Sequence, residues 1–231
     1  MRILALLVLW SAALTGAEVE KSFSPKSVRW GVDHGCVTAT LSGALHGLTA
    51  VGSPDLPCLP LQVVLPEGAG PASLRVTWDE TELARGVVLA PVQPPCRPGL
   101  PRPAWVGPDP VVYASTSVLP AVPAVLDGIQ MVRGRQIAQV RVSPLRYQPS
   151  TGAVALCTRL VITVETAAPA AKPRLAGAAR RRNDARVHDA LAPLVANPEA
   201  LTATVSAPLA LAPATSAGTP AAGTPRSGPP R

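Results

Sequence analysis

Hydrophobic and polar residues alternate along two runs of the chain, residues 138–143 and 154–165. The apolar residues of one parity are Ala138, Val140 and Val142 in the first run and Val154, Leu156, Leu160, Ile162 and Val164 in the second. Because side chains alternate across a strand, each run predicts a strand with one buried face. Between the runs, Pro149 presets φ for a turn and Gly152 supplies a residue that tolerates positive φ. The pattern predicts a β-hairpin.

Further short runs of strand-forming residues recur before this hairpin, separated by segments rich in Gly and Pro. They are VRWGV from Val28, CVTATLSG from Cys36, LQVVLP from Leu61, SLRVTWDE from Ser73, GVVLAP, VVYAS and QMVRGRQIAQVRVSP. The 28 prolines disfavour long helices, because proline breaks helix interiors. We therefore expect one all-β domain over residues 18–166, an antiparallel β-sandwich with jelly-roll-like winding.

The pattern changes after Thr166. Residues 167–183 read as a basic linker, and residues 184–197 place Val187, Leu191, Leu194 and Val195 at helical spacing. This predicts a short helix, capped by Asn183 or Asp184 and limited by Pro193. Residues 198–231 consist largely of Ala, Pro, Thr, Ser and Gly, which predicts a disordered tail.

The first 17 residues have the features of a secretory signal peptide. Arg2 precedes an apolar stretch over residues 3–14, too short to span a bilayer, and Thr15 and Ala17 supply small residues at a cleavage site. An uncleaved anchor is the alternative. We expect a secreted or periplasmic protein that has no membrane association once the signal is cleaved.

Four cysteines are widely spaced: Cys36, Cys58, Cys96 and Cys157. In an oxidising compartment they predict two disulfides with three possible connectivities, and free buried thiols are the alternative. No Cys-x-x-Cys or paired Cys/His cluster occurs, so we expect no metal and no cofactor.

Positive charge is concentrated at the C-terminal end of the chain. Residues 1–166 contain 13 Lys and Arg against 11 Asp and Glu, whereas residues 167–231 contain 8 against 3. A basic segment without interleaved aromatic residues argues against nucleic-acid binding, because stacking platforms are missing.

Two histidines and one cysteine raise the question of catalysis. An apolar run ends in His46-Gly47 and a later one ends at Cys157, an order that resembles cysteine peptidases of the caspase–gingipain clan. His34, which precedes Gly35 and Cys36, and His46 read as loop or sheet-surface residues. That clan builds its catalytic pair on a parallel sheet with helices, whereas this chain predicts Pro-rich antiparallel strands. The acidic segment at residues 79–82 reads as a solvated strand end, not a calcium site. The residues favour a non-catalytic protein.

Two segments carry a family resemblance. RGRQIAQVRVSPLRYQPSTGAVALCTRLVITVE, from Arg133 to Glu165, resembles the end of the propeptide domain of gingipain-type cysteine peptidases, and GSPDLPCLPLQVVLPEGAGPASLRV, from Gly52 to Val76, resembles an earlier part of it. The matching motif residues are Arg133, Gly134, Val142, Pro144, Tyr147, Pro149, Thr151 and Gly152. The resemblance covers roughly residues 28–166. It implies a β-sandwich that chaperones or inhibits a cysteine peptidase domain.

The resemblance also suggests where the module acts on its partner. If it restrains an Arg-specific peptidase, Arg97 and Arg102 in the loop PPCRPGLPRPAW are candidates to occupy the specificity pocket. A candidate processing site is the run Arg180, Arg181 and Arg182. In the family a catalytic domain follows the propeptide, and here a low-complexity tail follows instead. A secreted module that binds surfaces or glycans, and a remnant of a peptidase gene, are the alternatives.

Overall fold

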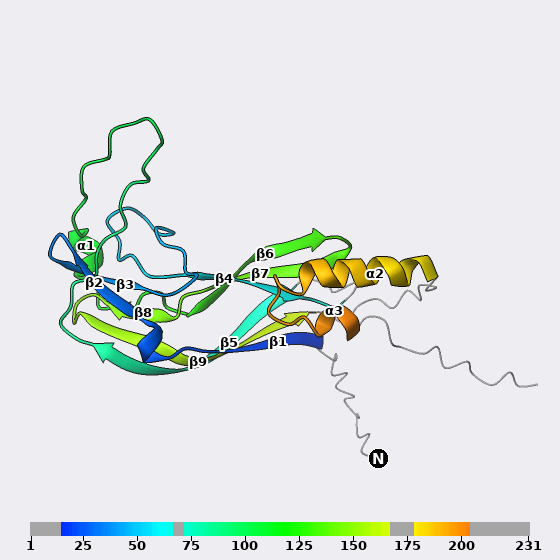
Figure 1. Cartoon of the computed structure of the whole chain (residues 1–231). Helices are drawn as coiled ribbons and strands as arrows, with labels where there is room; N and C mark the ends of the chain where they lie inside the picture. Colours follow the sequence, from blue (N-terminus) through cyan, green and yellow to red (C-terminus); the bar gives the residue numbers. More distant parts are fainter. Residues whose placement is uncertain (1–14, 67–71, 167–177, 204–231) are drawn as a thin grey trace, which may run out of the picture.

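The computed structural model describes residues 15–66, 72–166 and 178–203. All paired strands are antiparallel, and they form two larger sheets and one small sheet (Figure 1). The first sheet contains β1 (Thr15–Ser22), β9 (Ala153–Thr166), β5 (Ala72–Ala84) and β8 (Leu145–Gln148). The second contains β4 (Leu59–Val64), β7 (Arg135–Val142) and β6 (Ala124–Val132), and the small sheet contains β2 (Arg29–Asp33) and β3 (Cys36–Thr40). The expectation of an antiparallel all-β fold is confirmed, and the jelly-roll-like winding stays a prediction.

The main hydrophobic core lies between the two larger sheets. Its fully buried members come from both: Val63, Ala138, Leu160, Ile162 and Val164. The predicted parity on β9 is confirmed, because every even-numbered apolar residue of that strand is buried. Alternation on β5 is also as expected, with Leu74, Val76 and Trp78 packed against this core.

The predicted hairpin is partly wrong. The run over residues 138–143 belongs to β7, which pairs with β4 and β6, whereas the second run is β9 of the other sheet. The chain passes from one sheet to the other at Ser143 and Pro144, where proline has no N–H to continue a ladder. The hairpin that does form joins β8 to β9 through residues 149–152. Gly152 has φ +62°, as the turn prediction required.

The C-terminal helix begins earlier and ends earlier than expected. Helix α2 covers Ala178–Leu191, so it includes part of the predicted basic linker, and it ends two residues before Pro193. The good helix formers Ala and Arg explain the earlier start, and the restriction before proline explains the end. A short helix, α3 (Ala200–Ala203), follows. Residues 167–177 of the linker and residues 204–231 of the tail lie outside the described residues.

The segment after α2 closes the edge of β4. Val187, Leu191, Val195 and Leu201 pack on Val64 and Ile137 to form a separate small core. The backbone N–H of Ala196 donates to the carbonyl of Gln62 (2.8 Å). The buried Asn197 side chain accepts from the N–H of Val64 (2.8 Å) and donates to its carbonyl (3.0 Å), so it replaces a neighbouring strand.

Asn197→Ala is expected to lower the free energy of unfolding by roughly 2–4 kcal/mol, because it leaves a buried N–H and a buried C=O of Val64 without partners. Chemical denaturation measures the loss. Asn197→Asp, which places a buried carboxylate against the carbonyl of Val64, should be at least as destabilising at neutral pH. Equal stability of the parent and both variants would contradict this role of Asn197.

The predicted cleavage point after Ala17 lies within β1. Residues 1–14 of the predicted signal peptide are outside the described residues, and Ala17 pairs with Val164. Cleavage after Ala17 would leave Glu18–Ser22 paired with the β9 residues from Thr163 to Arg159. Among the described helices, none has the length and apolar character needed to cross a membrane.

Candidate functional site

A long loop projects from the sheets between β5 and the short helix α1 (Pro110–Tyr113) (Figure 1). Its root, residues 86–92, is fixed to β3. The N–H of Val37 donates to the carbonyl of Val88 (2.8 Å), and the N–H of Ala90 donates to the carbonyl of Val37 (2.8 Å). Leu89 between them is fully buried. The loop therefore leaves the body from a firmly held segment.

Two tyrosine hydroxyls are hydrogen-bonded to the same root segment. Tyr113 donates its hydroxyl to the carbonyl of Leu89 (2.6 Å), and Tyr147 donates to that of Val87 (3.0 Å). The two rings meet edge to face, with centroids 6.2 Å apart. Burial raises the pKa of both hydroxyls, so they stay protonated and keep donating at neutral pH.

The motif residues of the β8–β9 turn reach the root as well. The N–H of Gly86 donates to the carbonyl of Thr151 (3.1 Å), and the N–H of Val87 donates to that of Gly152 (3.1 Å). The turn itself closes with the N–H of Gly152 donating to the carbonyl of Pro149 (3.2 Å). These motif positions are structural, and what they fix is the point where the loop starts.

The other motif residues form a turn and a crossing between sheets. Arg133 and Gly134, at φ +49° and +79°, are the two central residues of the tight turn between β6 and β7. The carbonyl of Pro144 accepts from the N–H of Cys157 (2.8 Å), which ties the crossing to β9.

One side chain clamps the two arms of the loop together. Gln93 donates from Nε2 to the carbonyls of Pro91 and Val106 (2.9 Å each) and accepts from the N–H of Val106 (2.8 Å). Beyond this clamp, every residue from Pro95 to Trp105 is exposed. The Gln93 side chain therefore marks the boundary between the hydrogen-bonded root, residues 86–92, and the exposed part of the loop.

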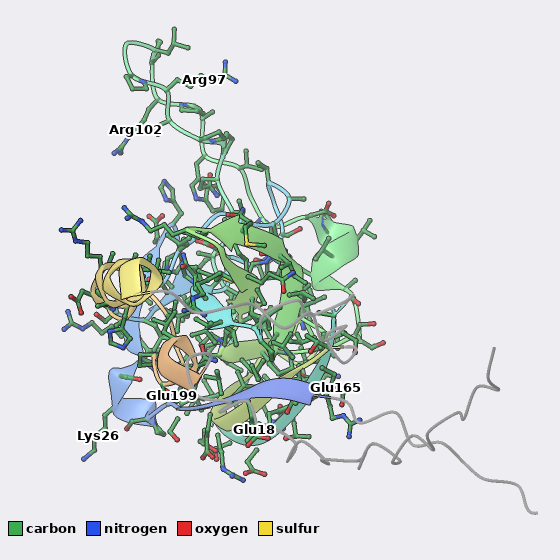
Figure 2. The ribbon with its side chains drawn as sticks, turned by 90° about the vertical axis from the view of Figure 1, so that its right-hand side faces the viewer. Glu18, Lys26, Arg97, Arg102, Glu165 and Glu199 are labelled. Atoms are coloured by element: carbon green, nitrogen blue, oxygen red, sulfur yellow. The ribbon has the colours of Figure 1, made fainter. Side chains whose placement is uncertain are left out.

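The loop carries the two predicted arginines. A turn forms where the N–H of Leu100 donates to the carbonyl of Arg97 (3.2 Å), with Pro98 and Gly99 (φ +79°) as its central residues. This is the arrangement preferred in a type II turn. Figure 2 shows Arg97 and Arg102 on the projecting part of the loop, with their side chains directed outward from it on opposite sides. Within the part of the chain that the structure describes, neither makes an ion pair.

The loop touches the β2–β3 turn at one point. Trp105 stacks on the imidazole of His34, with ring centroids 4.9 Å apart and an interplanar angle of 17°. His34 Nδ1 also lies 2.8 Å from a carboxylate oxygen of Asp33. His34 therefore supports the foot of the loop.

The predicted disulfides are not present: all four cysteines are free thiols. Cys36, Cys58 and Cys157 are buried on separate elements, and Cys96 is exposed on the loop. The even count suggested pairs, but three of these residues act as small apolar side chains of the cores. The alternative of free buried thiols is the one observed for these three.

The structure predicts one reactive thiol in the folded protein and four in denaturant. Cys96 is accessible, whereas burial raises the pKa of Cys58 and raises that of Cys157 to about 11, which keeps both thiols protonated. Thiol titration with and without guanidinium chloride measures both numbers. Fewer than four thiols in denaturant would show that disulfides form after all.

The structure gives no support to a Cys–His catalytic pair. Cys157 is fully buried with a protonated thiol, and His46 is bound to Asp55 (Nδ1 to Oδ2, 3.2 Å). The acidic segment 79–82 is engaged in ion pairs, since Glu80 contacts Arg146 (2.7 Å) and Glu82 contacts Arg85. Among the described residues, no three His, Cys, Asp or Glu side chains group as a metal site would require.

The candidate processing site lies in a helix. The backbone of Arg180, Arg181 and Arg182 belongs to α2 instead of an extended linker, and their side chains lie outside the described part. Their role in processing stays a prediction.

Comparison with known proteins identifies the family. The sequence matches the family Propeptide_C25 over residues 36–183, which is more than half of the chain. The chain belongs to the Propeptide_C25 family. The resemblance to gingipain-type propeptides is thereby confirmed, and the chain is a prodomain-like module. No curated protein matches the sequence significantly.

Two solved structures are similar to this chain. One is the complex of Porphyromonas gingivalis RgpB pro- and mature domains, with TM-score 0.64, 19% identity, and coverage of 83% of this chain and 95% of that one. The other, on the zymogenic latency of gingipain K from Porphyromonas gingivalis, has TM-score 0.49, 19% identity, and coverage of 69% and 95%. At this identity the first likeness shows the fold.

Sequence reasoning missed three residues that organise this propeptide: Gln93, Trp105 and Asn197. Each acts through a partner distant in sequence, so no local pattern marks it. Gln93 lies in a proline-rich stretch, where an amide that bridges two chain segments looks the same as a solvated one.

Proposed function

We propose that this propeptide restrains a cysteine peptidase by inserting its projecting loop, residues 94–105, into the active-site cleft. The observation that carries the proposal is the loop itself. It is exposed from Pro95 to Trp105, is clamped at its base by Gln93, and carries two arginines that form no ion pair with any residue that the structure describes. A propeptide that presents a pre-ordered loop has less conformational entropy to lose on binding.

Either arginine fits the role of a pocket ligand. A guanidinium forms paired, charge-assisted hydrogen bonds with a carboxylate in a pocket that binds arginine. Arg97 and Arg102 are each followed by proline, Pro98 and Pro103. The missing N–H and the fixed φ of proline make the following peptide bond a poor scissile bond. Such a loop would occupy the cleft without being cut.

The proposal includes export of the propeptide. Residues 1–17 are taken as a signal peptide, which makes the protein secreted or periplasmic. In support, strand β1 retains Glu18–Ser22 against β9 after cleavage at Ala17. The N-terminal residue of the exported protein, measured by mass spectrometry, should be Glu18; an intact Met1 would contradict this part.

Inhibition of a peptidase tests the function. The purified chain is mixed with the mature domain of Porphyromonas gingivalis RgpB, and hydrolysis of an arginine-containing peptide is followed. Concentration-dependent inhibition is expected, with the chain recovered uncut at Arg97 and Arg102. Full activity at high micromolar concentrations of the chain would refute the proposal.

A further inference from the structure

An apolar hollow of about 480 Å³ lies beside the foot of the projecting loop. Its walls come from four separate segments: Pro54 and Leu56, Val112 of α1, Leu119, and Val122 and Val125 beside and on β6. This volume is enough for several apolar side chains or a small ligand. We call these residues the hollow.

The hollow and the loop are parts of one rigid face. The N–H of Gly52 donates to the carbonyl of Val92 (2.9 Å), and the N–H of Asp109 donates to the carbonyl of Gly52 (3.0 Å), so both arms of the loop are bonded to the segment that leads into the hollow. Val92 in turn donates to the carbonyl of Ser53 (2.7 Å). The side chain of Asp109 accepts from the N–H of Val111 (2.8 Å) and so caps α1, the helix that follows the loop and contributes Val112 to the hollow. The segment that leads into the hollow is therefore held against the base of the loop.

The hollow is open to solvent and electrically neutral. Leu48, Val122 and Val125 at its edge are 44%, 45% and 43% exposed. The one charged side chain that lines it, Arg141, is paired with Asp127 at 2.8 Å. Large exposed apolar groups gathered in a concave surface are typical of sites that contact another protein.

The edge of β4 and the exposed positions of β5 differ from the hollow in this respect. The edge of β4 is covered by Ala196 and Asn197, and the exposed positions of β5 are polar, with Arg75, Thr77 and Asp79 outward. Covered strand edges and polar strand faces resist association with other chains. The hollow has no such protection, so its apolar surface is available to a partner.

We propose that the hollow is a second binding site for the peptidase, which takes one or more apolar, uncharged side chains from the peptidase surface beside the cleft that receives the loop. This inference rests on the proposed function, because the loop brings the peptidase to this face. In this arrangement the charged loop supplies the arginine, and the neutral hollow supplies buried apolar area. Apolar anchors in desolvated pockets carry a large share of binding energy in protein interfaces.

The test compares binding of the full chain and three variants to the mature domain of Porphyromonas gingivalis RgpB, by calorimetry. Val122→Glu and Val125→Glu place a charge at the hollow, and Leu194→Glu places the same charge on an apolar residue that is 60% exposed beyond α2. Thermal melting confirms that each variant is folded. We expect the two hollow variants to bind at least tenfold more weakly, and Leu194→Glu to bind as the parent does.

The outcomes separate this inference from the proposed function. If the parent binds and both hollow variants match Leu194→Glu, the hollow is not a contact and the inference is overturned while the function stands. If the parent itself fails to bind, the proposed function is overturned, and the inference with it. Equal weakening by all three variants would show an unspecific effect of added charge, which also overturns the inference.

Discussion

Gly152→Val is expected to destabilise the propeptide by roughly 2–6 kcal/mol, a large part of the total stability of a domain. Gly152 has φ +62°, a conformation that a β-branched residue rarely adopts. A Cβ at this position would also lie 2.6 Å from both the N and the O of Val87, which are backbone atoms that cannot move aside. Strain and overlap therefore act together. Chemical denaturation of the parent and the variant measures the difference.

Gly35→Val is the matched control. Gly35 also has positive φ, +80°, in a tight turn, but no atom lies within 4 Å of where its Cβ would be. The control should lose only the strain, about 1–3 kcal/mol. Equal losses in the two variants would show that the contact between Gly152 and Val87 is not tight.

The location of Gly152 connects stability to function. Its carbonyl accepts from Val87 at the root of the projecting loop, and Tyr147 bonds the same residue. The overlap caused by a valine at 152 would therefore fall directly on this root. These motif residues therefore fix the base of the loop.

Local patterns predicted what local interactions determine. The parity of β9 and β5 could be read from the sequence, because one face of each strand packs on the core. The turn at Pro149 and Gly152 could be read because glycine permits a backbone that other residues avoid.

Partners distant in sequence could not be predicted in this way. Nothing in the run from Ala138 to Leu145 shows that the chain changes sheets at Pro144, since both strands have the same alternation. The cysteines were misread because an even count says nothing of the distances between them. Asn197 binds Val64, 133 positions away, and a lone Asn before proline resembles an ordinary turn residue.

The arginines of the candidate site could be predicted from the sequence, but the contacts that hold their loop could not. Arg97 and Arg102 were selected for their charge and the prolines after them, and the structure places both on an exposed, projecting loop. The features that make the loop usable are the Gln93 clamp and the stacking of Trp105 on His34. Both are tertiary contacts, so the sequence could indicate a loop but not its rigidity.

Substitution of the loop arginines should have the largest effect on inhibition. We expect Arg97→Ala, and the double change to alanine at Arg97 and Arg102, to raise the inhibition constant at least tenfold, equivalent to roughly 1.4 kcal/mol, against a peptidase that cleaves after arginine. Arg102→Ala alone should have a smaller effect. The reason is the loss of charge-assisted hydrogen bonds in the specificity pocket. Arg186→Ala, an exposed arginine of α2, is the control and should inhibit as the parent does. Inhibition constants are measured with an arginine-containing peptide substrate.

Lysine variants distinguish an arginine that is bound in the specificity pocket from a general attraction between opposite charges. Arg97→Lys and Arg102→Lys keep the positive charge and lose the planar, paired hydrogen-bonding geometry. At the arginine that occupies the pocket, lysine should recover only part of the affinity, whereas at the other it should be neutral. Because Arg97 begins the turn closed by Gly99, its backbone is the better fixed of the two, and we expect it to be the pocket ligand. If the parent inhibits and the double alanine variant inhibits equally well, the loop arginines do not occupy the specificity pocket, and the inhibitory contact lies elsewhere on the propeptide.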